Sequence, residues 1–344
     1  MFESISNRNS PNWKIRWVAT ALVLALLAGL VWILRMTQMP LKSYAQPLPP
    51  LSGAESEIEG RLSTEVKYLS QTVGERNVWR AGSLQTIANH LRNNLQQAGY
   101  SVTERSYRVE GQEISNLEVS ITGSEGAGET VILGAHYDTV AGTVGADDNA
   151  TGVAALLELA WQLRGSKPRK NIRFVVFVNE EPPFFQTSRM GSRVYARQLR
   201  RENVRVSAMI SLEMLGFYSD VPGSQKYPAL LGLFYPSRGD FVGFVGNSEA
   251  RDLVRRSIRV FRESTSFPSQ GIAAPAEWPG IGWSDQWSFW QKRYPAIMIT
   301  DTALFRYPYY HTPLDTADRL DFDRMARVVE GVQRVVESLS TGQD

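Results

Sequence analysis

The sequence predicts an α/β sandwich built around a largely parallel sheet, with one transmembrane helix before it. Three observations carry this prediction. Short apolar runs alternate with helical stretches over residues 84–339, and a long apolar segment without charge lies near the N-terminus. Acidic and imidazole side chains directly follow several of the apolar runs. Strands that alternate with helices favour parallel pairing, because each connecting helix packs on the sheet.

The composition excludes several classes of protein. The 344 residues include 37 Lys and Arg and 35 Asp and Glu, so the formal net charge is only +2. That balance argues against a strongly basic nucleic-acid binder, and we expect no nucleic-acid partner. The chain has no cysteine, which excludes disulfides and thiolate metal sites. Any histidine chemistry must use His90, His136 or His311.

The N-terminal apolar segment has the length of a membrane span. Residues 17–34 read WVATALVLALLAGLVWIL, which is 18 residues without a charge. At ~1.5 Å per residue, such a helix is ~27 Å long and crosses the apolar core of a bilayer. A cleaved signal peptide is the alternative, but its apolar run is usually about 7–15 residues long. We therefore expect an uncleaved anchor.

Charges around this segment predict its orientation. Basic residues flank it on both sides: Arg8, Lys14 and Arg16 before it, and Arg35 and Lys42 after it. With the N-terminal amine, the tally favours an N-terminus inside. We expect a single-pass membrane protein with its large domain on the extracytoplasmic side. The expected segments are an N-terminal tail (1–16), a transmembrane anchor (17–34), a Pro-rich linker (35–50) and one large domain (51–344).

The large domain contains regular elements in alternation. Apolar runs predict strands at residues 101–109, 117–121, 130–135, 171–178, 208–212 and 296–300. Helical spacing predicts helices at residues 84–95, 152–163, 188–200, 248–264 and 322–339. A less regular region, rich in Gly, Pro and aromatic residues, covers residues 216–282.

Chemically active side chains follow three of the predicted strands. His136 follows the first of them, Glu180 and Glu181 follow the second, and Glu213 follows the third. Sites in open sheets form outside the carboxyl ends of the strands, so we expect these side chains to gather at one edge. Imidazole and carboxylate are suitable zinc ligands, and two metal ions ~3.5–4 Å apart need a carboxylate that bridges them. A glutamate that is not a ligand would then act as general base.

Each element also has a simpler interpretation. Residues 147–149 have the composition of a turn and helix cap. Residues 180–181 have that of a solvated acidic turn. However, a lone carboxylate such as Glu213 is costly to bury at the end of an apolar strand. Asp138 is placed to orient His136 through a hydrogen bond. The simple interpretations need separate coincidences, so we favour a metal site.

Five segments, in this order and spacing, resemble the zinc exopeptidases of peptidase family M28. They read HYD (136–138), GADDNATG (145–152), NEE (179–181), SLEMLG (211–216) and YHTPLDT (310–316). That family includes bacterial leucyl-type aminopeptidases and glutamate carboxypeptidases, and glutaminyl cyclases are its relatives. The resemblance covers residues 60–340 and implies a three-layer α/β sandwich with a mixed, mostly parallel central sheet.

The resemblance also implies a cofactor and residue roles. It implies two Zn²⁺ ions, in a site that could also accept Mn²⁺ or Co²⁺. The implied ligands are His136 and Glu213 on one ion, Glu181 and His311 on the other, and Asp148 bridging both. Glu180 would be the general base and Asp138 would orient His136. A cis peptide bond often follows the bridging aspartate, here between Asp148 and Asn149.

Three positions depart from the family pattern. Glu213 stands where many members have Asp, Gln286 stands where a histidine is more common, and Ile281 occupies about the place of a tyrosine that aids the transition state. The resemblance thus implies a membrane-anchored dinuclear zinc aminopeptidase that acts on peptides with a free N-terminus. A glutaminyl cyclase-like acyltransferase and a non-catalytic, peptidase-like ectodomain are the alternatives.

Overall fold

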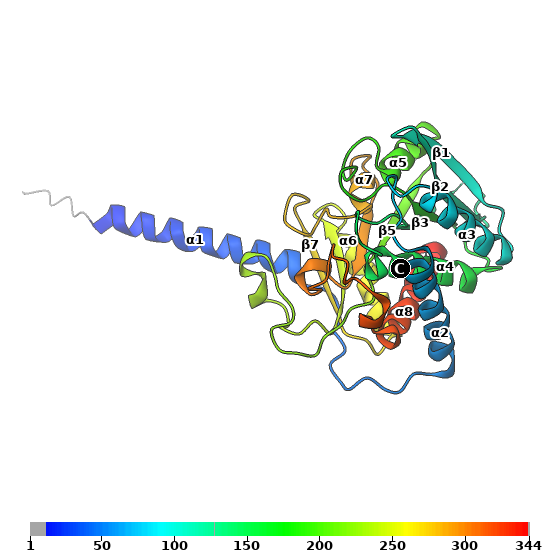
Figure 1. Cartoon of the computed structure of the whole chain (residues 1–344). Coiled ribbons are helices and arrows are strands. Elements are labelled where there is room, and N and C mark those ends of the chain that lie inside the picture. Colours follow the sequence, from blue (N-terminus) through cyan, green and yellow to red (C-terminus); the bar gives the residue numbers. More distant parts are fainter. Residues whose placement is uncertain (1–11, 127, 343–344) are drawn as a thin grey trace, which may run out of the picture. The chain divides into compact units, whose positions relative to one another are not determined.

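The computed structural model describes residues 12–126 and 128–342 (Figure 1). The chain divides into two compact units, Met1–Gln38 and Met39–Asp344. Residues 1–11 of the expected N-terminal tail (1–16) lie outside the described residues.

The first unit contains one long helix, α1 (Asn12–Thr37). Its segment Ile15–Thr37 is long and apolar enough to cross a membrane, and it includes the expected span at residues 17–34. A signal sequence near an N-terminus has the same length and composition.

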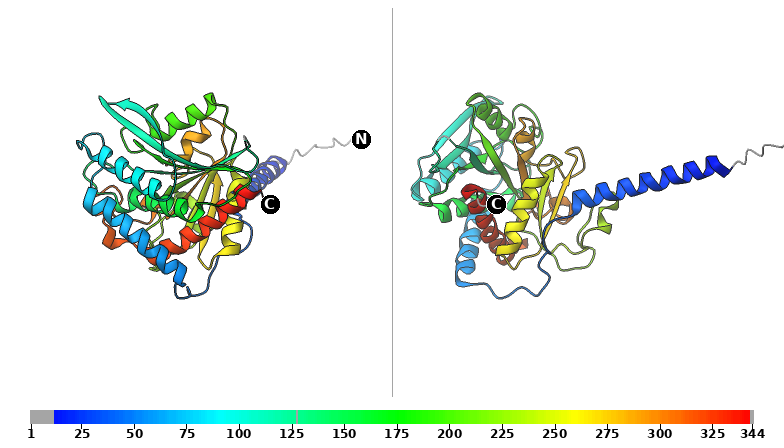
Figure 2. Two further views of the ribbon diagram at one scale, coloured as in Figure 1. Left: turned by 90° about the vertical axis from the view of Figure 1, so that its right-hand side faces the viewer. Right: turned by 180° about the vertical axis from the view of Figure 1, so that it is seen from behind.

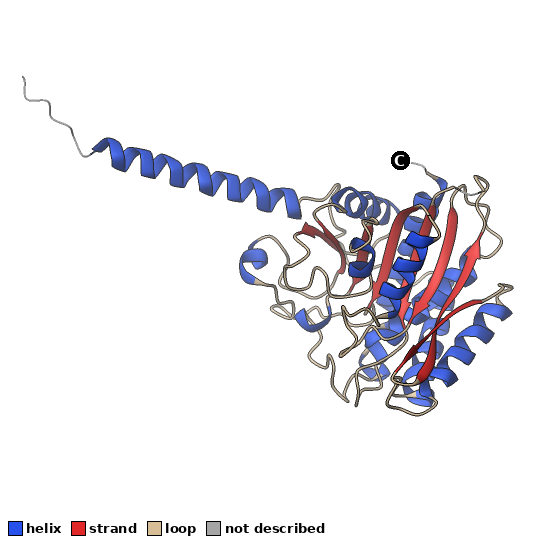
Figure 3. Cartoon of the chain, turned by 90° about the horizontal axis from the view of Figure 1, so that it is seen from above, coloured by secondary structure: helices blue, strands red, loops and turns tan. Residues whose placement is uncertain are grey.

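The second unit is built on one sheet of eight strands among the described residues, in the order β1-β2-β4-β3-β5-β8-β6-β7 (Figure 3). The strands are β1 (Thr103–Val109), β2 (Gln112–Ile121), β3 (Thr130–His136), β4 (Asn171–Phe177), β5 (Val206–Glu213), β6 (Val242–Asn247), β7 (Ser269–Ala274) and β8 (Ala296–Thr300). Pairing is parallel for β4–β3, β3–β5, β5–β8 and β6–β7, and antiparallel for the other three pairs. The prediction of a mixed, mostly parallel sheet is confirmed.

Helices cover both faces of this sheet. The α-helices of the second unit are α2 (Gly53–Lys67), α3 (Ser83–Gln97), α4 (Gly152–Leu163), α5 (Gly191–Arg201), α6 (Arg251–Ser264), α7 (Gln286–Trp290) and α8 (Phe322–Thr341). Short 3-10 or π turns are η1 (Tyr68–Val73), η2 (Ala146–Thr151), η3 (Ala229–Leu233), η4 (Ala303–Phe305) and η5 (Ala317–Arg319). The layer of α2, α3, α4, α6 and α8 packs on one face, and α5 and α7 pack on the other. In Figure 2, the red α8 lies beside the yellow α6.

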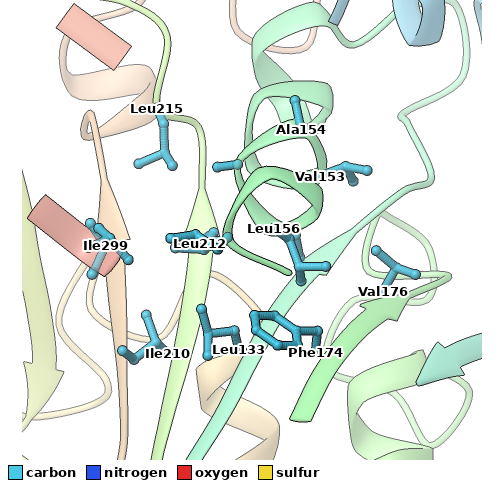
Figure 4. Close-up of a cluster of buried hydrophobic side chains, with 14 of the residues drawn as sticks. Leu133, Val153, Ala154, Leu156, Phe174, Val176, Ile210, Leu212, Leu215 and Ile299 are labelled. Carbon is cyan, nitrogen blue, oxygen red and sulfur yellow. The ribbon is translucent and has the colours of Figure 1, made fainter. Parts of the chain in front are cut away.

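Alternation along the strands divides the core between the two faces. On β3, Val131 and Leu133 belong to the larger cluster under α4, whereas Ile132 belongs to the smaller cluster under α5. Figure 4 shows part of the larger cluster, where Leu133 and Phe174 lie below the α4 side chains. Side chains of a strand point to opposite faces in turn, so a sheet buried on both faces needs apolar residues at every position. This explains the continuous apolar runs that predicted the strands.

Two strands of the irregular region, β6 and β7, were not predicted. Each contains glycine, which weakens the strand signal in the sequence. A Cβ on Gly246 would lie 2.6 Å from Val254 Cγ2 of α6. A Cβ on Gly271 would lie 2.8 Å from Met39 Cγ. The close packing against β6 and β7 therefore requires glycine, and glycine is also the residue that weakens the strand signal in the sequence.

Candidate active site

The carboxyl ends of three parallel strands hold most of the predicted site. His136 and Glu213 are the last residues of β3 and β5, and the pair Glu180 and Glu181 follows β4. Asp148 lies in η2, directly before α4. The structure therefore gathers at one edge of the sheet residues that are far apart in the sequence.

Two three-residue groups lie at this edge, and they share one carboxylate. His136 Nε2 lies 3.4 Å from Asp148 Oδ1 and 3.4 Å from Glu213 Oε2. His311 Nε2 lies 3.0 Å from Asp148 Oδ2 and 3.3 Å from Glu181 Oε2. The candidate ligand atoms within each group all lie within 4.8 Å of one another. Asp148 thus offers one oxygen to each group.

Glu180 and Asp138 complete the set of predicted residues. Glu180 is buried beside the first group, with Oε2 3.9 Å from His136 Nε2. The Asp138 carboxylate accepts the backbone N–H groups of Glu180 and Glu181, each at 3.1 Å. His136 Nδ1 lies 3.2 Å from the Asp138 carbonyl oxygen and 3.7 Å from Asp138 Oδ1. Asp138 therefore fixes both the imidazole and the turn that carries the two glutamates.

The loop that presents Asp148 is held by Asp315, from the end of the YHTPLD segment. Asp315 Oδ1 accepts the backbone N–H of Asp147 at 2.8 Å, and Oδ2 accepts that of Asp148 at 3.1 Å. The Tyr307 hydroxyl donates to Asp315 Oδ1 at 3.0 Å. The peptide bond between Asp148 and Asn149 is cis, as the family resemblance implied.

Two residues that sequence reasoning did not select hold Glu213 in place. The Ser284 hydroxyl donates to Glu213 Oε2 at 2.7 Å. The Asn149 amide donates to the Leu212 carbonyl at 2.9 Å and lies 3.4 Å from Glu213 Oε2. Asn149 stands inside a segment already noted, and Ser284 stands two residues before Gln286, in the segment 282–286 that also resembles the family.

A buried arginine supports the site from below and was also missed. Arg76 is 1% exposed. Its guanidinium donates only to backbone carbonyls in the described part of the chain: Leu69, Gly74, Tyr137, Val144 and Gly145. Burial lowers its pKa to about 10, so the group stays charged at neutral pH. Arg76 therefore ties the loop before Asp148 to the turn after β3.

Burial and mutual repulsion dominate the electrostatics of the cluster. Burial raises the pKa of Glu180 well above its ordinary value, and it raises the pKa of Glu181 to about 8. Burial acts on Asp148 in the same direction, but the two imidazoles hold its pKa below the ordinary value. Burial lowers the pKa of His136, and the neighbouring carboxylates more than offset this, so the pKa is raised well above its ordinary value. The cluster holds more negative charge than the imidazoles balance, which a bound cation would correct.

The donor set fits a divalent metal ion. Four buried atoms of the two groups make no hydrogen bond within residues 12–126 and 128–342: His136 Nε2, Asp148 Oδ1, Glu181 Oε1 and His311 Nε2. Buried polar atoms are nearly always paired, so orphaned atoms that converge on one place indicate an absent ligand. Imidazole nitrogen and carboxylate oxygen are ligands typical of zinc.

The two unusual positions Gln286 and Ile281 lie beside the site. The Gln286 side chain is fully buried, and its amide donates to the Ile281 carbonyl at 2.9 Å. Ile281 forms part of the wall of a neighbouring pocket. Neither belongs to the two groups that share Asp148.

That pocket is apolar and encloses about 110 Å³. Glu213 and Tyr310 line it and connect it to the site. Its other walls are mainly aromatic and aliphatic, including Phe241, Phe244, Ile281, Trp283 and Phe305. The Tyr310 ring stacks on His311, with centroids 3.7 Å apart. Burial raises the pKa of Tyr310 above its ordinary value, and the nearby carboxylates add to the rise, so its hydroxyl remains a donor.

Comparison with known proteins adds two kinds of similarity. The model of Peptidase family M28 matches residues 116–336. Uncharacterized protein YfbL of Escherichia coli (strain K12) is 40% identical over 281 residues, which cover 79% of this chain and 85% of that protein.

Solved structures share the fold at low sequence identity. BSAP, a zinc aminopeptidase from Bacillus subtilis, aligns with a TM-score of 0.66 and 14% identity, over 81% of this chain and 94% of that one. The glutaminyl cyclase of Bacteroides thetaiotaomicron aligns with a TM-score of 0.60 and 17% identity, over 84% of this chain and 99% of that one.

Proposed function

This chain belongs to peptidase family M28, and from that premise we propose that it is a membrane-anchored aminopeptidase with two zinc ions. Family membership supports a zinc-dependent peptidase that acts on peptides. The number of ions, the release of N-terminal residues and the anchor are inferences from the residues of this chain.

The observation that carries the proposal is the position of Asp148. Its two oxygens face different groups, at 3.4 Å from His136 Nε2 and at 3.0 Å from His311 Nε2. A carboxylate shared in this way suits a pair of ions, because two-metal sites place their ions ~3.5–4 Å apart. In our proposal, His136 and Glu213 complete one site, and Glu181 and His311 complete the other.

When bound, zinc would lower the pKa of a water molecule and polarise the scissile carbonyl. The protein supplies the remaining chemistry. Glu180 accepts the proton of the attacking water and later transfers it to the leaving amine. Burial raises the pKa of Glu180 above its ordinary value, which favours a carboxyl group that first accepts a proton and then donates it. Asp138 keeps Glu180 in position through the backbone N–H at 3.1 Å.

Tyr310 is the donor that we assign to the developing oxyanion. Its ring stacks on His311, and it lines the apolar pocket together with Glu213. A hydroxyl group at this position could donate to the substrate carbonyl oxygen. It would thereby replace the tyrosine whose place Ile281 takes.

The pocket supports an apolar N-terminal residue in the substrate. Glu213 lies in the wall of the pocket, beside aromatic and aliphatic residues. An N-terminal residue whose side chain enters the pocket would therefore place its carbonyl group at the site. An exopeptidase that accepts Leu, Met or Phe at the N-terminus fits this pocket.

The experiment that tests the proposal uses the full chain in detergent micelles. Zinc per chain is measured by plasma mass spectrometry, and hydrolysis is measured with a panel of aminoacyl-p-nitroanilides. We expect two zinc ions per chain and hydrolysis of apolar substrates that a chelator removes and zinc restores.

Other results would redirect the assignment. One zinc ion, with cyclisation of N-terminal glutamine in place of hydrolysis, would establish the acyltransferase alternative. A chain that retains no zinc and releases no amino acid would overturn the enzymatic proposal.

A further inference from the structure

Exposed apolar side chains lie in the wall of the apolar pocket and on a neighbouring loop. Trp283, Leu304 and Leu233 are 44%, 42% and 77% exposed. The first two line the pocket, and the third follows the pocket residue Leu231 by two positions. Apolar side chains gathered around one opening are unusual on a surface that faces only water.

Phe305 joins these loops into one surface. The Trp283 ring stacks on the Phe305 ring, with centroids 6.1 Å apart. The backbone N–H of Lys226, at the start of the loop that carries Leu233, donates to the Phe305 carbonyl at 2.7 Å. Leu304 is the preceding residue. Trp283 and Leu304 therefore belong to one supported surface, and the loop that carries Leu233 is joined to it at Lys226. We call Leu233, Trp283 and Leu304 the pocket rim.

The beginning of the second unit is hydrogen-bonded to α6 and to β7. Strand β7 is an edge strand of the sheet and also lines the pocket. Arg262 of α6 donates to the carbonyls of Pro40 and Leu41, at 2.9 and 2.8 Å. The backbone N–H of Ser269, at the start of β7, donates to the Ser43 hydroxyl at 2.9 Å. Residues 39–43, which belong to the expected Pro-rich linker (35–50), are thus held against α6 and β7.

These residues are connected to the pocket through β7. The Met39 side chain packs directly over Gly271, which leaves no room there for a Cβ. The Gly271 carbonyl accepts the Tyr235 hydroxyl at 2.7 Å, and both residues line the pocket. The chain therefore enters the domain beside the wall of the pocket.

The apolar segment that we propose as an anchor ends at Thr37, two residues before Met39. Two extended residues cover at most ~7 Å. If the segment spans a bilayer, Met39 cannot lie far from the bilayer surface, and the β7 edge lies near it too. Within the second unit, β1 lies at the opposite edge of the sheet from β7 (Figure 1).

The polar residues around the rim also suit a bilayer surface. Lys42, Lys226 and Arg238 are exposed, on the fixed segment and on the loop that carries Leu233. Cationic side chains beside apolar ones match anionic headgroups above acyl chains. On β1, by contrast, the exposed residues are polar or charged, such as Thr103 and Glu104.

We propose that the pocket rim and residues 39–43 form a surface that contacts the bilayer, with the pocket opening at the membrane. The partner is a lipid surface containing anionic headgroups. The substrates are then peptides adsorbed to that surface, with an apolar N-terminal residue in the interface. This inference rests on the proposed anchor and deepens the proposed function.

The absence of cysteine makes a direct test possible, because each single-cysteine variant carries one label. Spin labels are placed on full-length L233C, L304C, T103C and V23C in nanodiscs of phosphatidylcholine and phosphatidylglycerol. Power saturation compares accessibility to oxygen, which concentrates in the bilayer, with accessibility to a soluble nickel chelate. Thr103 is exposed on β1 and serves as the control for an aqueous site. Val23 lies within the candidate span and reports whether it is inserted.

We expect the ratio of oxygen to nickel accessibility to be several-fold higher at L233C and L304C than at T103C, and highest at V23C. Aqueous ratios at both L233C and L304C, with V23C inserted, would overturn the proposed surface. An aqueous ratio at V23C would overturn its premise, the anchor. Zinc content and turnover are measured on the unlabelled chain, so a failure of the peptidase assignment leaves these ratios unchanged and is recognised separately.

Discussion

Two buried clusters of charge lie next to each other in this protein, and they are built in opposite ways. The Arg76 guanidinium donates to five backbone carbonyls in the described part of the chain. The neighbouring carboxylate and imidazole cluster leaves atoms such as His136 Nε2 and Glu181 Oε1 without a hydrogen bond there. Both clusters are buried, so burial alone does not distinguish structure from function. The two clusters differ in whether their polar atoms have hydrogen-bond partners.

This contrast follows from the energetics of buried polar groups. A buried charge that is fully hydrogen-bonded holds the chain together, and its loss leaves partners unpaired. An unsatisfied cluster costs stability unless something binds it, and binding sites commonly trade stability for function in this way. Variants of Arg76 should therefore reduce stability, whereas variants of the cluster should reduce activity.

The largest expected effect is on turnover. Glu180→Gln removes the proposed general base but not a proposed ligand, so we expect kcat to fall by ~10²–10⁴-fold. Zinc per chain and thermal stability of the zinc-loaded protein should stay near those of the wild type. Steady-state hydrolysis of leucyl-p-nitroanilide and mass spectrometry measure both. Unchanged turnover would remove Glu180 from the mechanism.

Glu158 provides a matched control for that variant. It is an equally buried glutamate, but its carboxylate is held by Arg61 Nε and Nη2, both at 2.7 Å. We expect Glu158→Gln to leave kcat unchanged and to lower the free energy of unfolding by about 1–3 kcal/mol. A loss of turnover in this variant would break the contrast between satisfied and unsatisfied charge.

The second effect is on stability. Arg76→Met leaves five carbonyls without their donor and neighbouring carboxylates without a buried cation, so we expect the free energy of unfolding to fall by about 3–5 kcal/mol. Urea denaturation followed by circular dichroism measures the loss. In the exposed pair of Arg169 and Glu125, the substitution Arg169→Met should change stability by less than about 1 kcal/mol. Equal stability of the two variants would contradict the structural role of Arg76.

Burial and conspicuous chemistry explain which elements and residues the sequence predicted well. Strands β3, β4, β5 and β8 were predicted because both faces of the sheet are covered, which produces uninterrupted apolar runs. The structure brings all seven predicted site residues together. His136, Glu180, Glu181 and Glu213 meet because the carboxyl ends of parallel strands lie at one edge of an open sheet. Residues whose chemistry is conspicuous were therefore accessible to sequence reasoning.

Residues that act through geometry were not accessible in that way. Arg76 belongs to no motif, and the role of Ser284 within its segment could not be read from the sequence. The importance of both depends on carbonyls and carboxylates that the fold brings to them. Strand β7 was missed because Gly271 interrupts its apolar pattern. The contact of Met39 with that glycine shows why the pattern is interrupted, but only once the fold is known.

A smaller effect tests the support of a ligand. Ser284→Ala removes the hydroxyl that donates to Glu213 Oε2 at 2.7 Å, so we expect zinc affinity to fall by about 10–100-fold. Competition with a chromophoric chelator measures the affinity. Ser192 is also fully buried, but its hydroxyl donates to Ser288 at 2.9 Å, so Ser192→Ala should leave zinc affinity unchanged. Equal losses in both variants would indicate a general packing effect.

The smallest expected effect is the change in stability caused by Glu181→Gln. This effect separates the two clusters most clearly, because its sign should reverse when zinc is bound. In the zinc-free chain, burial raises the pKa of Glu181 from 4.5 to about 8. Between these values the folded state binds a proton that the unfolded state has lost, so this group lowers stability as the pH rises through that window. Glu181→Gln removes the penalty. In the zinc-free state above pH 8, we therefore expect the free energy of unfolding of the variant to be about 0.5–2 kcal/mol higher than that of the wild type. This gain should fade as the pH falls towards 4.5.

With saturating zinc the same variant should be less stable than the wild type, because it lacks a proposed ligand and gains less from binding. Urea denaturation at pH 5 and pH 8.5, with zinc and with chelator, measures the four differences. Glu158→Gln should destabilise under all four conditions, since its partner Arg61 is independent of zinc. A Glu181→Gln variant that also destabilises the zinc-free chain at pH 8.5 would mean that the cluster is held by the protein alone. The lack of hydrogen bonds to its atoms would then no longer indicate a metal site.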